Sequence, residues 1–348
     1  MNAFITVLLL QDGLTTGAIY VLIAIVLVML FSVTRVIFVP QGELISFAAL
    51  TLAWLQTGRM PGTVWLVAGA ALLVGCIDGY NYLMRGRKRS DLQSALAYVT
   101  IPIPVFLAAY LAPDWPYWLQ VIACIAIIAP LGPVIYRLAF QPLADASVLM
   151  LLIVAVAVHF MLLGTGLLLF GAEGVRTPAL VSGHIQIGPY PLSAQAIFVW
   201  VSAVVLLTAT YFFFSFSLWG KALRATAFNR VGARLVGIPS RFAATVVFLM
   251  ASLVGAISGI LIAPITTIYY DTGFLIGLKG FIAAIVGALV SYPVAAIGAL
   301  SIGLTETFVS FWASTFKDVI VFAAIVPVLI WQNFFLADAH VADDEDEE

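Results

Sequence analysis

Long apolar runs separated by short polar segments dominate the pattern of the chain. The runs lie at about 14–33, 42–57, 63–84, 93–112, 117–139, 146–170, 194–217, 242–269, 275–291, 294–314 and 318–336. A membrane-spanning helix needs about 20 apolar residues. These runs are continuous rather than alternating, and a helix pairs its backbone groups within the segment. The pattern predicts an all-α polytopic membrane protein with about 8–11 transmembrane helices, the shortest runs being broken or re-entrant.

Composition excludes a large soluble protein. The 348 residues are 63% hydrophobic and 9% charged, whereas soluble domains carry about 25% charged residues. Cys76 and Cys124 fall inside apolar runs without the spacing of a metal site, so we expect no metal. No basic residue precedes the first apolar run, which predicts an uncleaved first segment rather than a secretory signal.

The distribution of charge predicts the orientation. Basic residues gather in the RGRKR segment at 85–89 and in 219–241, and the positive-inside rule places both in the cytoplasm. Four runs separate them, so the two assignments agree. The same count places the N-terminus and the long loop 171–193 outside. The tail 338–348 holds seven acidic residues and is expected to be disordered. The count places it in the cytoplasm if 275–291 crosses the membrane and outside if that run is re-entrant.

Three stretches are unlike simple spans because Gly, Pro and polar residues interrupt them. They are 11–17, 39–47 and 263–289, the second with Glu43 at the start of a helix. Short, interrupted hydrophobic segments in both halves of a chain indicate a transport site near the middle of the bilayer, where half-helix N-termini suit a substrate carboxylate. The alternative is that these stretches are loops and helix ends at the membrane surface.

Three ionisable residues lie inside apolar runs and are expected to face the bundle interior. The simplest interpretations are structural: His159 bonding a neighbouring carbonyl, Glu306 tying two helices together, and Asp78 pairing with Arg85. They form no aligned proton relay, which disfavours a proton-coupled mechanism.

The segment 219–240 predicts one amphipathic helix of about four turns, opened by Gly220 and closed by Gly237 and Pro239. An apolar stripe and a basic face run along it. The stripe consists of Phe228, Val231, Leu235 and Ile238, and the basic face carries Arg230 and Arg234. Such a helix fits either anionic lipid or a groove on a cytoplasmic partner.

This segment, LRATAFNRVGARLVGI, resembles the cytoplasmic coupling loop of ABC-importer permeases in the branched-chain amino acid family, which carry a pattern like LRA…NREAARLLGI. The family's acidic residue after Asn-Arg is replaced by Val231 here. Residues 13–44 are similar to the family's first helix and following turn, with Pro40 and Gln41 replacing Ala-His. Residues 273–289 are similar to its GLKAF segment, and Glu306 and the pair Lys317-Asp318 also match.

The resemblance implies a permease domain at 1–337, with 62–116 as an inserted helix pair, 219–241 as the coupling loop and 338–348 as a tail. It implies a multi-pass protein of the cell inner membrane. Its partners would be a related second permease, two ABC ATPase subunits and an external solute-binding protein. The residues expected to couple to the ATPase are Leu223, Arg224, Asn229, Arg230, Ala233, Arg234 and Gly237. Those expected to line the substrate path are Thr15, Thr16, Gly17, Gly42, Glu43, Gly277 and Lys279.

The chain contains no G-x-x-x-x-G-K-[ST] phosphate loop. We therefore expect no catalytic residue, no enzyme activity and no cofactor in this chain, ATP being hydrolysed by partner subunits, and no nucleic acid partner. Family substrates are Leu, Ile and Val, with urea and short amides in a close branch. The alternatives are such a urea or amide permease, an ion-coupled secondary transporter, or a non-transporting scaffold or sensor. Co-purification of an ATPase separates the last two from an ABC importer.

Overall fold

The computed structural model describes residues 3–84, 89–324, 326, 327 and 330. Within these ranges, eight helical segments are long and apolar enough to cross a membrane, which confirms an all-α polytopic membrane protein. The loop residues 85–88 and the acidic tail 338–348 lie outside the described residues.

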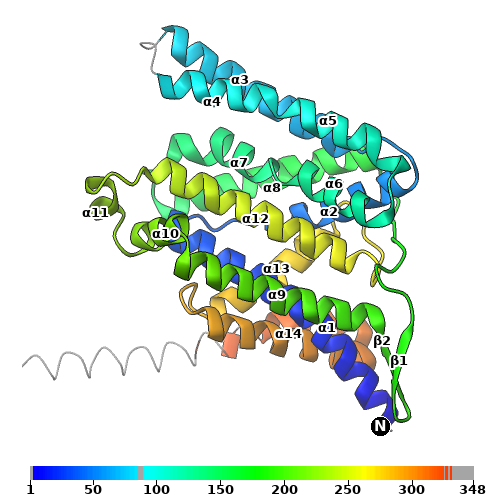
Figure 1. Ribbon diagram of the computed structural model, residues 1–348. Helices are drawn as coiled ribbons and strands as arrows, with labels where there is room; N and C mark the ends of the chain where they lie inside the picture. The colour runs from blue at the N-terminus through cyan, green and yellow to red at the C-terminus, as the bar shows by residue number, and fades with distance from the viewer. Residues whose placement is uncertain (1–2, 85–88, 325, 328–329, 331–348) are drawn as a thin grey trace, which may run out of the picture. The chain divides into compact units, whose positions relative to one another are not determined.

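The helices follow one another through the whole described chain (Figure 1). They are α1 (Ala3–Thr34), α2 (Gln41–Gln56), α3 (Gly62–Met84), α4 (Arg89–Thr100), α5 (Pro102–Leu111), α6 (Tyr117–Ile128), α7 (Leu131–Ile135), α8 (Val148–Phe170), α9 (Ala194–Phe216), α10 (Leu218–Phe228), α11 (Arg230–Leu235), α12 (Ser240–Ile262), α13 (Thr272–Val286), α14 (Tyr292–Ala313) and α15 (Lys317–Ala323). Strands β1 (His184–Ile187) and β2 (Tyr190–Ser193) form an antiparallel hairpin. Short turns complete the list: the 3-10 turns Ala112–Asp114, Gln141–Leu143 and Ser314–Phe316, and the π-helical turn Tyr136–Phe140.

The chain forms two compact units. The first contains residues 1–28, 181–204 and 279–348, and the second contains 29–180 and 205–278. Three of the four boundaries between them fall inside α1, α9 and α13, and the fourth lies between residues 180 and 181, before β1.

Helix α2 is the centre of the second unit. Fourteen of its 16 residues are buried, and its faces pack against α12 and α6 (Figure 1). Gly259 of α12 allows a close approach to the backbone of Ile45, because any side chain there would overlap the Ile45 carbonyl. A helix that is apolar around its whole circumference belongs in a core of this kind.

Helices α3, α4 and α5 cover the residues predicted as an inserted pair, and α3 packs against both α4 and α5. Asp78 of α3 is fully buried, and its carboxylate accepts hydrogen bonds from Arg137 and from Ser94. The expected partner, Arg85, lies outside the described residues. The partner found, Arg137, is 59 positions away in the π-helical turn.

In the first unit, α1 and α14 approach at small residues. Gly17 and Gly303 lie so close that a Cβ on Gly303 would overlap the backbone of Gly17. Trp200 of α9 adds a hydrogen bond from Nε1 to the Thr15 hydroxyl at 3.1 Å. Phe4 stacks on Tyr190 of the hairpin, with ring centroids 6.2 Å apart.

Candidate functional site

Helix α2 of the second unit and helix α13, which begins in that unit, are too short to span a bilayer alone. Helices α2 and α13 contain 16 and 15 residues, hence about 24 and 22 Å at 1.5 Å per residue, against a hydrocarbon core of about 30 Å. Each follows a non-helical stretch containing a proline, Pro40 before α2 and Pro264 before α13. The sequence predicted broken segments at both places.

The N-terminal ends of these two helices meet at glycines. A Cβ on Gly42 would overlap the Gly273 carbonyl, and one on Gly277 would lie 2.8 Å from the Gly42 Cα. The Ser46 hydroxyl accepts a hydrogen bond from the Gly273 amide at 2.7 Å. Since only glycine lacks a Cβ, these positions permit the backbone contact. We call this contact the helix crossing.

His159 places the helix crossing at half the depth of the bilayer. It is the middle residue of α8, 11 residues and therefore about 16 Å from either end. Its Nδ1 lies 2.6 Å from Glu43 Oε1, and its ring stacks on Phe274 with centroids 4.5 Å apart. The expectation that His159 bonds a neighbouring carbonyl is therefore wrong. The partner is a carboxylate 116 positions away, which no local pattern reveals.

The helix crossing combines positive helix ends with a buried carboxylate. Unpaired N–H groups give a helix N-terminus a partial positive charge, which stabilises Glu43 in the first turn of α2. Glu43 is 1% exposed, and within the described part of the chain its second oxygen, Oε2, has no hydrogen-bond partner. A buried polar atom without a partner costs free energy, so the helix crossing has an unused acceptor.

A cavity of about 220 Å³ opens beside the helix crossing, within the second unit. Its lining combines polar and apolar side chains. Its lining consists of His159, Leu163, Asp271, Thr272, Phe274 and Leu275.

The predicted path residues divide into two groups. Gly42, Glu43 and Gly277 come together at the helix crossing. The others belong to the first unit: Thr15 and Thr16 donate to backbone carbonyls of their own helix, and Gly17 packs against α14. Thr16 also lines a first-unit cavity of about 290 Å³ together with Asp12 and Glu306. The path assignment stays a prediction.

Lys279, the last predicted path residue, is part of a buried ion network in the first unit. Its ammonium lies 2.5 Å from Glu306 and 2.9 Å from Asp318, and the Tyr20 hydroxyl donates to the other oxygen of Glu306 at 2.6 Å. The network joins α1, α13, α14 and α15, consistent with the expectation that Glu306 ties helices together. Lys279 is 4% exposed.

The predicted coupling segment is two helices, so the expectation of one continuous helix is wrong. Asn229 adopts an extended conformation (φ −146°, ψ 100°) between α10 and α11, and its side chain caps α11 by accepting from the Gly232 amide at 2.8 Å. Asn followed by a short helix is a recognisable N-cap signal. Leu223 and Ala233 are buried, while Gly237 has φ +89°, a conformation suited to glycine, after the last turn.

Two arginines of this segment hold it to the rest of the second unit. Arg230 donates to the Ala144 carbonyl at 3.1 Å, and Arg234 donates to Asp145 at 3.2 Å and to Ser240 at 2.6 Å. Residues 144–145 precede α8, the helix that carries His159. Arg224 donates to the Ser215 carbonyl.

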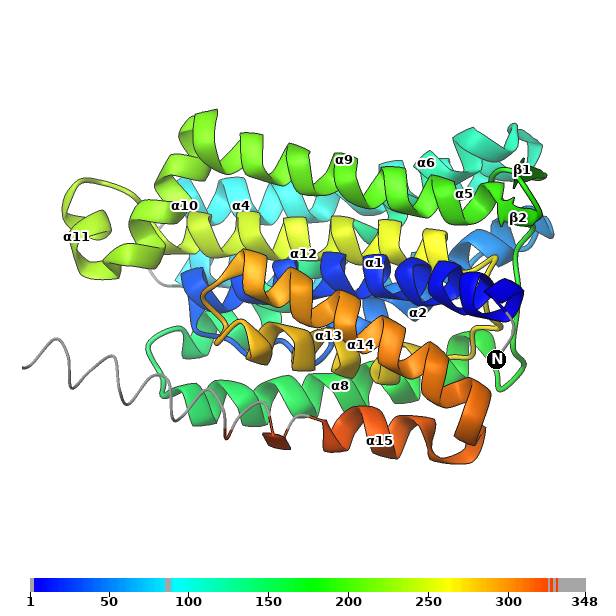
Figure 2. The ribbon, with the colours of Figure 1, turned by 90° about the horizontal axis from the view of Figure 1, so that it is seen from below.

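The large apolar side chains of α10 and α11 are exposed instead of forming a buried stripe. Phe228 is 95% exposed and Leu235 84%, and Val231 and Val236 are also largely exposed. Figure 2 shows both helices beside the first turn of α12, at the end opposite to the segment that follows Ile262. Several exposed apolar side chains on one short segment are typical of an interaction surface. We call it the α10–α11 surface.

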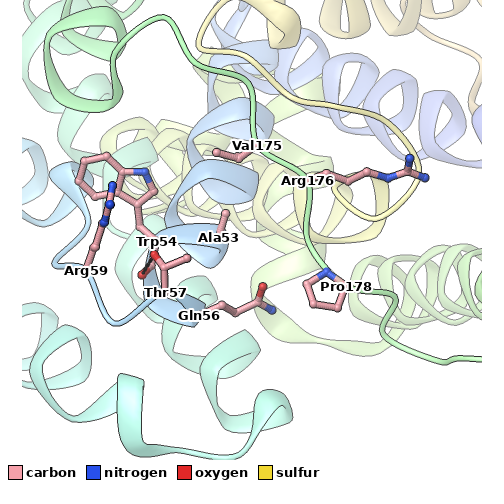
Figure 3. Close-up of a pocket in the computed structure, with 8 residues that line it drawn as sticks. All are labelled: Ala53, Trp54, Gln56, Thr57, Arg59, Val175, Arg176 and Pro178. Carbon is pink, nitrogen blue, oxygen red and sulfur yellow. Dashed lines mark hydrogen bonds between the residues drawn. The ribbon is translucent and has the colours of Figure 1, made fainter.

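A second hollow, of about 440 Å³, lies where α2 and α12 end. Segment 175–178 packs there against 264–268, with Val175 bridged to Ile268 and Arg176 donating to the Pro264 carbonyl. Figure 3 shows Arg59 beside Trp54, Gln56 extending toward Pro178, and Arg176 extending away from the others. The lining holds two arginines and no acidic residue.

Apolar spanning helices, two helices too short to span that meet near the middle of α8, and an exposed apolar surface at one membrane side are typical of the transmembrane subunit of a transporter. More particularly, the chain belongs to the family described as branched-chain amino acid transport system / permease component, whose model matches residues 94–329. It is a multi-pass membrane protein.

Curated relatives agree. The chain is 30% identical over 224 residues to the high-affinity branched-chain amino acid transport system permease protein LivH of Escherichia coli (strain K12), covering 61% of this chain and 73% of the relative. It is 25% identical to the corresponding permease protein BraD of Pseudomonas aeruginosa, covering 93% and 92%. A solved structure, PsaBC from Streptococcus pneumoniae in complex with Fab, shares 14% identity over 92% of this chain and 90% of that one with a TM-score of 0.36, which defines no common fold.

Proposed function

We propose that this chain is the permease subunit of an inner-membrane ABC importer for hydrophobic amino acids of the leucine, isoleucine and valine type. The family membership and the names of its relatives support this substrate class. Separate ATPase subunits supply the energy, so the chain itself needs no cofactor. A second permease subunit completes the membrane part.

The α10–α11 surface is the observation that carries the proposal. Aliphatic and aromatic side chains exposed on short, capped helices fit a groove on a cytoplasmic protein. Arg230 and Arg234 donate hydrogen bonds to residues 144–145, which precede α8. A displacement of the α10–α11 surface would therefore be transmitted to α8. ATP-driven closure of the ATPases would thereby reach the helix crossing.

The hollow shown in Figure 3 is the corresponding candidate on the other side. Because α12 begins at the side predicted to be cytoplasmic and crosses once, its far end faces outward. Arg59 lines this hollow and has no ion pair within the described part of the chain, so it suits an acidic side chain of an external solute-binding protein.

The first test is co-purification in detergent with the candidate ATPases. Phe228→Asp with Leu235→Asp should abolish ATPase recovery, because a charge in the centre of an apolar interface is desolvated without a partner. Val290→Asp, at a residue 70% exposed in the connection between α13 and α14, is the matched control and should recover ATPase normally. Absence of any ATPase from the parent protein would refute the importer assignment.

Substrate class is tested separately by ATP-dependent uptake in vesicles containing the whole complex. Labelled leucine should accumulate and labelled urea should not. Accumulation of urea alone would assign the chain to the urea and short-amide branch instead. Leucine uptake that persists without ATP and follows an ion gradient would indicate a secondary transporter.

A further inference from the structure

The cavity beside the helix crossing is lined by a carboxylate, that of Asp271, whose charge is not paired with any described residue. Asp271 lines this cavity, and no side-chain hydrogen bond or ion pair of Asp271 exists among the described residues. The nearest lysine along the chain, Lys279, is already engaged by Glu306 and Asp318. Thr272, not Asp271, provides the local turn bond, accepting from the Tyr269 amide at 2.9 Å.

The position of Asp271 makes this unusual. The cavity also contains His159, the middle residue of a spanning helix, and Leu163, one turn further along it. An exposed carboxylate at this depth is too costly to face lipid and therefore faces water or a solute. Glu43 behind His159 adds a second acid with an unused oxygen, so the surroundings favour a cation.

The remaining lining is apolar. Leu163, Phe274 and Leu275 are its apolar members, and Phe274 stacks on the His159 ring. The volume of about 220 Å³ is below the roughly 300–1,000 Å³ of pockets for drug-sized ligands. It suits a solute with one small cationic end and one aliphatic end.

We propose that this cavity is a transient binding site for an amino acid crossing the membrane, in which Asp271 pairs with the α-ammonium group and Leu163, Phe274 and Leu275 receive the aliphatic side chain. His159, which also lines the cavity, is held in place through Nδ1 by Glu43. The site rests on the proposed import function and adds to it a recognition step within the permease itself.

The test is binding of labelled leucine to the purified permease–ATPase complex without any external binding protein. The parent should bind saturably, and 4-methylpentanoate, which is leucine without its amino group, should not compete. Asp271→Asn should weaken binding at least about tenfold, as expected for losing one charge-assisted hydrogen bond. Asp271→Glu should retain part of the affinity. Glu173→Gln, at an exposed acid outside the cavity, is the control and should bind like the parent.

A second variant keeps the proposal testable if Asp271→Asn folds poorly. Leu163→Phe reduces the apolar side of the cavity, so leucine binding should fall while alanine binding persists. Equal leucine binding by the parent and Asp271→Asn overturns the site, as does effective competition by 4-methylpentanoate. Failure of the parent to take up any hydrophobic amino acid would instead refute the import function, which the uptake assay measures independently.

Discussion

Two carboxylates of the helix bundle, Glu306 in the first unit and Glu43 in the second, differ in burial and in how completely they are paired. The Glu306 side chain is 14% exposed and lines a cavity, whereas Glu43 is 1% exposed. Both oxygens of Glu306 are occupied, one by Lys279 and the other by Tyr20. Glu43 has one oxygen on His159 and, within the described chain, nothing on the other. A fully paired charge holds helices together, whereas a partly paired buried charge can still bind a transient ligand.

The largest expected effect comes from removing the cation of the paired site. Lys279→Ala leaves the Glu306 side chain, 14% exposed, and the Asp318 side chain, 37% exposed, without their cation. Breaking a fully buried ion pair costs about 3–5 kcal/mol, and the partial exposure of both acids places the expected loss below that range. We expect poor recovery of folded protein and a strongly lowered midpoint of thermal unfolding in detergent. Lys221→Ala, at an exposed lysine, is the control and should unfold like the parent. A Lys279→Ala protein of normal stability would contradict the structural role of the network.

Replacing each of the two glutamates by glutamine tests whether their roles differ. Glu306→Gln should destabilise clearly more than Glu43→Gln, because it disrupts two hydrogen-bonded partners and leaves Lys279 undercompensated. Glu43→Gln keeps an acceptor for His159, so its cost should be about 1 kcal/mol, while leucine uptake should fall. Unfolding curves and uptake are measured for both. Equal stability losses would remove the distinction between the sites.

The smallest stability effect is expected at an exposed pair. Arg234 and Asp145 have side chains 47% and 81% exposed, and such pairs contribute about 0–1 kcal/mol. Arg234→Ala should therefore leave the unfolding midpoint almost unchanged but lower uptake per ATP hydrolysed, because the α10–α11 surface loses one attachment to the segment before α8. If uptake per ATP hydrolysed is unchanged, Arg230 alone is sufficient to transmit the displacement of the α10–α11 surface to α8.

Much of the fold was predictable because hydrophobic runs determine spanning helices locally. Gly and Pro at 39–47 and 263–289 correctly predicted broken segments. The same expectation for 11–17 is wrong, because this stretch contains no proline and lies inside the continuous helix α1. The pairing of His159 with Glu43 and of Asp78 with Arg137 was not predictable, because each depends on contacts between distant segments. The break at Asn229 was missed although its signal is local: an amphipathic pattern continued across it.

The candidate site residues also divide into those that the local sequence predicts and those that depend on the fold. Gly42, Glu43 and Gly277 were proposed from broken-helix logic and come together in the structure. Leu163 and Phe274 were not singled out, because a Leu or a Phe in an apolar run is normally a core or lipid-facing residue. Only the cavity distinguishes them.

The burial of α2 has a consequence for how the protein is made. A 16-residue helix with a glutamate in its first turn is a poor candidate to enter lipid by itself, since charged residues resist insertion. Its principal neighbour, α12, ends about two hundred residues later in the chain. At about 5–20 residues per second, the ribosome completes α12 roughly 10–40 s after α2. During that interval α2 lacks its main packing partner. We therefore expect the membrane-insertion machinery to bind α2 until α12 has been made.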